Sequence, residues 1–201
     1  MVRDFFSDEV RVLIRPVKGY VRLMEAPLAS PERAVLSRVL LLLAVIGAAG
    51  SFSSAGRLVL HHMLFVPVGW LALPLLQAAG LFVSLRFTDK PPPQLRALEL
   101  YLAGNGPFFL FALGLSAVLL LASDVSATFG WLLASGLLVA FGFFTMGWSW
   151  LTSYGFYKSC AGCRPGKAAR LVVLEWAVKI GLALVWYQTI NNLLPQFVGT
   201  R

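Results

Sequence analysis

Apolar residues gather in five long stretches, separated by shorter segments rich in charge, glycine and proline. A helix needs about 20 residues to cross the hydrocarbon of a bilayer, and each stretch is of that order. The pattern predicts an all-α, polytopic membrane protein with a bundle of five transmembrane helices. The expected spans are residues 35–52, 63–85, 107–122, 127–151 and 169–194. Pro67 and Pro74 predict a kink in the second span, because proline cannot donate a backbone hydrogen bond.

The first 30 residues form a different pattern. Apolar side chains recur at helical spacing at Val10, Ile14, Val17, Val21 and Met24. Four basic residues fall on a separate stripe, namely Arg11, Arg15, Lys18 and Arg22. We therefore expect residues 1–30 to be a cytoplasmic amphipathic segment preceding the transmembrane domain of residues 31–201. The segment either lies on the leaflet and binds anionic lipid or a partner, or caps the bundle without touching lipid. Pro16 also allows two short helices.

The basic residues predict the orientation of the chain in the membrane. Fourteen of the 17 Lys and Arg residues lie before the first span or in the second and fourth loops: Arg3, Arg11, Arg15, Lys18, Arg22, Arg33, Arg38, Arg86, Lys90, Arg96, Lys158, Arg164, Lys167 and Arg170. The opposite side holds only Arg57 and Arg201. Because cytoplasmic loops carry excess Lys and Arg, we expect a multi-pass protein of a bacterial inner membrane or an equivalent membrane. Its N-terminus is expected to be cytoplasmic and its C-terminus outside.

The amino-acid composition and net charge limit the class of protein and its expected partners. The chain is 58% hydrophobic and 13% charged, with a mean hydropathy of +0.77, which argues against a soluble domain. The net charge of +8 does not predict nucleic-acid binding, because the positive residues are spread over loops beside the spans. The expected partners are the lipid bilayer, with a preference for anionic lipid, and other membrane proteins or a second copy.

The expected spans contain few polar residues. Glu175 and Lys179 lie four residues apart in the fifth span and so share a helix face. They form either a structural salt bridge or a proton or ion relay.

Other expectations concern the ends of the spans. Arg38 is expected to extend to the lipid headgroups. Residues 103–107 are expected to break the helix where the third span enters. The aromatic residues at the end of the fourth span are expected at the interface, namely Trp148, Trp150, Tyr154 and Tyr157.

Two residue pairs are candidates for further chemistry. Cys160 and Cys163 form a CxxC in a basic loop, where the positive charges would lower a thiol pKa. An inert pair, a redox or intermolecular metal role, and lipid attachment are the alternatives. His61 and His62 could ligate a haem or pigment, although an interfacial pair without a ligand is favoured. We therefore expect no cofactor and no metal site within one chain.

The organisation of the chain resembles the Yip domain family. The resemblance lies in Pro27 and Pro31 of the N-terminal segment, in five spans, and in the stretch from Tyr154 to Trp186 with its glycine-containing basic loop. It implies a helical membrane protein without catalysis that recruits partners or shapes membranes.

No catalytic set appears in the sequence, which has neither a Ser/His/Asp arrangement nor a Walker loop. The expected function is therefore that of a non-enzymatic interaction, assembly or membrane-organising component. One alternative is a small transporter or ion-conducting module that uses Glu175 and Lys179. A second is an accessory subunit of a respiratory or photosynthetic complex, with His61 or His62 near the pigment.

Overall fold

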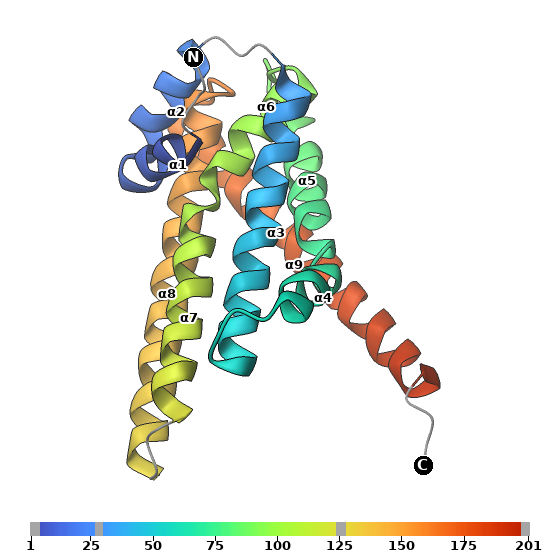
Figure 1. Cartoon of the computed structure of the whole chain (residues 1–201). Helices are drawn as coiled ribbons and strands as arrows, with labels where there is room; N and C mark the ends of the chain where they lie inside the picture. Colours follow the sequence, from blue (N-terminus) through green and yellow to red (C-terminus); the bar gives the residue numbers. More distant parts are fainter. Residues whose placement is uncertain (1–4, 27–29, 124–127, 198–201) are drawn as a thin grey trace.

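The computed structural model describes residues 5–26, 30–123 and 128–197. Within these ranges all regular secondary structure is helical, with nine α-helices, one 3-10 turn and no strand. The longest helices before residue 159 run in roughly the same direction, whereas the last helix crosses them obliquely and ends away from them (Figure 1). The expectation of an all-α fold is confirmed.

Four helical stretches are long and apolar enough to cross a bilayer. The first is α3 (Pro31–Ala55), and the second combines α4 (Leu60–Gly69) with α5 (Ala72–Leu85). The third runs through α6 (Gln94–Leu102), the 3-10 turn η1 (Ala103–Asn105) and much of α7 (Gly106–Ser123); the fourth lies in α8 (Thr128–Ser159). The fifth expected span corresponds to α9 (Pro165–Phe197), which is not among these four. Its passage through a membrane stays a prediction.

Both interrupted stretches have a sequence cause. Between α4 and α5, Trp70 and Leu71 form a turn, because Pro74 has no N–H to donate to the Trp70 carbonyl. In the third stretch the expected break at residues 103–107 appears as η1, after which the helix continues into α7.

The N-terminal segment forms two short helices, α1 (Phe5–Ile14) and α2 (Pro16–Glu25). Val12, Tyr20 and Leu23 are buried, and the Trp148 indole of α8 donates to the Leu13 carbonyl at 2.6 Å. Four members of the expected apolar stripe are instead exposed: Val10, Ile14, Val21 and Met24. The side chains that pack against the bundle therefore differ from the apolar stripe, and contact of that stripe with lipid stays a prediction. The pair α1–α2 packs against the bundle.

The three basic segments lie together at one end of the molecule (Figure 1). The α1–α2 pair packs beside the end of α8, where the Ser159 hydroxyl donates to the Val17 carbonyl at 3.1 Å. At the same end, Lys167 bonds to Asp89 across the two other basic loops at 2.7 Å. Helix α1 and the end of α9 lie at opposite ends of the molecule (Figure 1).

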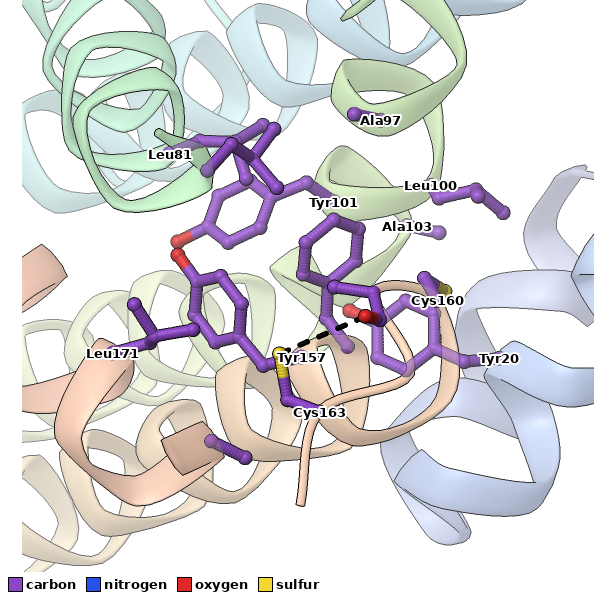
Figure 2. Packing of buried hydrophobic residues seen from close by; sticks show 14 of the residues in the cluster. Tyr20, Leu81, Ala97, Leu100, Tyr101, Ala103, Tyr157, Cys160, Cys163 and Leu171 are labelled. Carbon is purple, nitrogen blue, oxygen red and sulfur yellow. Dashed lines mark hydrogen bonds between the residues drawn. The ribbon is translucent and has the colours of Figure 1, made fainter. Parts of the chain in front are cut away.

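The core at this end packs aromatic rings among Leu, Ala, Val and Cys side chains (Figure 2). The Phe156 ring meets Tyr20 and Tyr101 edge-on, with centroids 5.8 and 5.5 Å apart. Tyr157, which was expected at the membrane interface, is fully buried in the same cluster. The chain then turns through Gly162, whose φ of +60° favours glycine, and this turn brings the loop back over the core.

Candidate functional site

Glu175 and Lys179 are bonded to each other in α9, as their spacing predicts. The Glu175 side chain is fully buried, and the Lys179 side chain is 15% exposed. Helix α5 packs on this turn at Gly80, where a Cβ would lie 2.9 Å from Lys179 Cγ. The missing side chain at Gly80 thus lets α5 cover the ion pair.

Two residues from other helices complete this cluster. Tyr101 of α6 donates its hydroxyl to Glu175 and accepts a bond from Lys179. Ser153 of α8 donates to Glu175 Oε1 at 3.2 Å. Glu175 Oε2 is buried and has no hydrogen-bond partner in the described part of the chain. The cluster is neutral overall, since one carboxylate faces one ammonium.

A second polar pair lies nearby. The Gln77 amide of α5 donates to Asn105 Oδ1 of η1 at 2.8 Å, and both residues are buried. This bond leaves Gln77 Oε1 and Asn105 Nδ2 without partners among the described residues. A buried polar group without a partner costs about 1–3 kcal/mol. The pair therefore offers one acceptor and one donor to a ligand or to water.

A cavity of about 250 Å³ connects these groups. Its lining comes from α2, α5, α6, η1, α7, α8 and α9: Tyr20, Leu73, Leu76, Gln77, Tyr101, Gly104, Asn105, Phe108, Ser149, Thr152, Ser153, Trp176, Lys179, Ile180 and Ala183. A Cβ on Gly104 would overlap the Tyr20 hydroxyl, so glycine there admits the Tyr20 side chain.

The directions of the helices show which lining residues of the cavity lie nearer to each end of the bundle. Tyr20, Tyr101 and Ser153 lie toward the basic end, because α6 starts and α8 finishes there. Leu73 and Ala183 lie further toward the other end, since α5 starts and α9 finishes in that half. Ile180 and Ala183 are exposed. The cavity is thus polar at its inner end and apolar where it reaches the surface.

A buried charged cluster joins α1 to the bundle. Arg38 of α3 donates to Glu9 at 2.9 Å and to Glu99 at 3.1 Å, and Arg96 donates to Glu99 at 2.8 Å. Arg38 is 1% exposed, so the expectation that it extends to the headgroups was wrong; two carboxylates hold it inside. Burial raises the pKa of Glu9 to about 7, against the opposing effect of Arg38.

The two cysteines lie in the core beneath the loop (Figure 2). Cys163 Sγ contacts the Ala161 carbonyl at 3.7 Å. Burial raises the pKa of both thiols, which is the opposite of the lowering expected from the basic loop. Desolvation exceeds the effect of Arg96 on Cys160 and of Lys167 on Cys163. This environment favours an inert thiol pair.

The two histidines lie at the start of α4, at the end of the bundle opposite the basic loops. His62 Nδ1 is 2.9 Å from the Ser54 hydroxyl, and the His61 ring packs against Phe65 with centroids 4.6 Å apart. No group of three or more His, Cys, Asp or Glu suited to a metal ion occurs among the described residues. Whether His61 or His62 meets a haem or pigment stays an open hypothesis.

The structure brings some predicted residues together and separates others. Glu175 and Lys179 line or support the cavity, whereas the basic residues of α1 and α2 lie outside it. Sequence reasoning missed Tyr101, Gln77 and Ser153 as members of the site. Gln77 carried a usable signal, since it is a lone amide inside an apolar stretch. Tyr101 and Ser153 carried no such signal, because tyrosine and serine also occur at many other positions near the membrane interface.

The fold and the cavity define a class: an all-helical protein with four helical stretches long and apolar enough to cross a bilayer. Comparison with protein-family models, with curated proteins and with solved structures returned no match.

Proposed function

We propose that the protein is a non-enzymatic integral membrane protein that binds one small amphiphilic molecule from the bilayer. The supporting observation is the cavity of about 250 Å³, with hydrogen-bonding groups at its inner end and apolar residues at its exposed end. Ligand sites typically combine apolar walls with a few convergent polar groups. An amphiphile would place its head beside Gln77 and Asn105 and its chain along Leu73 and Ile180.

The polar groups at the inner end of the cavity limit which kind of head group a bound amphiphile can have. Gln77 Oε1 accepts and Asn105 Nδ2 donates, while Lys179 is already neutralised by Glu175. A head that donates and accepts hydrogen bonds but has no net charge fits these groups. Water occupies about 30 Å³ per molecule in the liquid, so the volume suits a compact head such as an amide, a hydroxylated group or a small ring.

The orientation we propose has the basic end of the bundle on the cytoplasmic side. The support is that α1–α2 and the two basic loops lie at one end, combined with the excess of Lys and Arg in cytoplasmic loops. The polar end of the cavity then lies nearer the cytoplasm, and its apolar end opens toward lipid.

The test uses native mass spectrometry of protein extracted from its own membrane into lipid nanodiscs. Gln77→Met keeps the length of the side chain but removes its acceptor and donor. Gln94→Met makes the same change at an exposed position outside the cavity. We expect one retained amphiphile per chain in the parent and in the Gln94 variant, and its loss in the Gln77 variant. Retention by all three, or by none, would contradict the proposal.

A second candidate function is assembly with another membrane protein, in line with the resemblance to the Yip family. The observation that favours it is that residues 181–189 of α9 are exposed on every side of the helix. A stoichiometric protein partner in the same spectra would support this role, and its loss on Leu184→Ser together with Val185→Ser would locate the contact.

A further inference from the structure

A second hollow lies outside the cavity, between the two N-terminal helices. We propose that the groove between α1 and α2 binds a phosphate group carried by a lipid headgroup. The groove has a volume of about 430 Å³ and is lined by Arg11, Ile14, Arg15, Lys18, Gly19 and Arg22. This site is independent of the amphiphile cavity, with which it shares no lining residue.

The turn before Pro16 creates the groove. Helix α1 ends at Ile14 and α2 begins at Pro16, so basic residues that would form one stripe on a continuous helix come from two helices. The helices approach closely at Gly19, where a Cβ would lie 2.8 Å from Val12 Cα. Arg11 on α1 thereby shares one groove with Lys18 and Arg22 on α2.

The charge in this groove is largely uncompensated. Arg15, Lys18 and Arg22 are exposed, and they form no ion pair within the part of the chain that the structure describes. The Arg11 side chain is 49% exposed and its closest carboxylate contact is Asp8, at 3.7 Å. Four cations around one groove repel each other, and a bound anion would relieve that repulsion. The groove thus favours an anionic ligand.

Two features favour phosphate on a lipid. The planar guanidinium of arginine matches the tetrahedral oxygens of phosphate through paired hydrogen bonds, and three of the four cations are arginines. Ile14 lines the groove, and the same two helices carry further exposed apolar side chains, namely Val10, Val21 and Met24. Apolar residues beside basic ones are typical of helices that enter the headgroup region of a leaflet.

The experiment titrates the purified full chain, in phosphatidylcholine nanodiscs, with short-chain phosphatidylinositol 4-phosphate by calorimetry. The groove variant is Arg15→Gln with Lys18→Gln. The matched control is Arg33→Gln with Arg86→Gln, which removes the same charge from exposed positions of the basic segments outside the groove. Thermal unfolding of both variants verifies that they fold like the parent.

We expect the groove variant to bind about 30-fold more weakly, which corresponds to about 2 kcal/mol at 1.4 kcal/mol per tenfold. The control should change by less than about threefold, and added salt should weaken binding of the parent because exposed charges are screened. Equal loss in both variants, unchanged binding in the groove variant, or no binding by the parent would overturn the proposal. Competition by millimolar inorganic phosphate would identify free phosphate as the ligand of the same site. The absence of such competition would identify the lipid.

Discussion

Glu175 and Lys179 are paired inside the bundle, and their surroundings explain why the pair is tolerated. Each charge faces an opposite charge and has a further hydrogen bond, since Tyr101 and Ser153 donate to Glu175 and Lys179 donates to Tyr101. Buried ions are stable only when geometry and hydrogen bonds offset their desolvation. The pair therefore has a structural role whether or not it also moves a proton.

Glu175→Gln tests this role. The change removes the negative partner and leaves Lys179 as an uncompensated cation, which should destabilise the fold by about 3–5 kcal/mol. Adding Lys179→Met should restore most of the loss, since no buried charge then remains. Thermal unfolding in detergent measures both effects. If Glu175→Gln alone were as stable as the parent, the ion pair would contribute little to stability. A flux assay in liposomes would then be the next test of a proton or ion relay.

Glu9 is expected to make stability depend on pH. Its folded pKa is raised from 4.5 to about 7 by burial, so the folded state prefers the protonated carboxyl. The contribution of this group is fully present below pH 4.5 and is lost as the pH rises through about 7. Its size is about 3 kcal/mol, at 1.4 kcal/mol per pKa unit.

The measurement is the midpoint of thermal unfolding across this pH range. The parent should become less stable from pH 4.5 to 7. Glu9→Gln cannot ionise, so this slope should disappear in that variant. A parent whose stability rises over the same range would mean that Arg38 outweighs the effect of burial.

At the scale of helices, the cavity forms where the helices are interrupted. The turn at Trp70 and Leu71 precedes the helix that carries Gln77, and the 3-10 turn η1 carries Asn105 itself. Irregular backbone in a membrane protein is tolerated where it is buried or lines a cavity. The interruption η1 thus supplies Asn105, whereas Gln77 comes from the regular helix α5.

Close helix contacts depend on glycine at particular positions. A Cβ on Gly47 of α3 would lie 2.6 Å from the Met63 carbonyl oxygen of α4, whereas one on Gly136 of α8 would meet nothing within 4 Å. Gly47→Ala should destabilise the protein by about 1–3 kcal/mol through overpacking. Gly136→Ala should be neutral or stabilising by up to about 1 kcal/mol, since alanine favours helix. Thermal unfolding compares the two, and equal effects would contradict the α3–α4 packing.

At the scale of the whole molecule, the distribution of charge predicts its orientation. The test places one cysteine in each of two exposed loops, Lys90→Cys and Leu58→Cys, after both native cysteines have been replaced by alanine. Lys90 lies in the loop between α5 and α6, at the end that holds the basic segments, and Leu58 lies in the loop between α3 and α4, in the other half of the bundle. In intact cells an impermeant maleimide should label Leu58→Cys, and it should label Lys90→Cys only after permeabilisation. The reverse pattern would invert the proposed topology.

The sequence by itself determined the features that depend on local pattern. Hydropathy over about 20 residues located the long helices, proline and glycine located their breaks, and helical spacing paired Glu175 with Lys179. The five-span count and the membrane side of each end stay predictions. The position of α1–α2 against the bundle was left open between two alternatives, because amphipathic spacing does not say what covers a helix.

Only the tertiary structure decided which distant residues meet. Tyr101 reaches Glu175, Gln77 reaches Asn105, and Arg38 is held between Glu9 and Glu99. These contacts join residues far apart in the chain, and they depend on how each helix is rotated and where it crosses its neighbours. Hydropathy is similar on most faces of an apolar helix, so it carries no information on that rotation. The same reason explains why Arg38 was expected at the headgroups and was found buried.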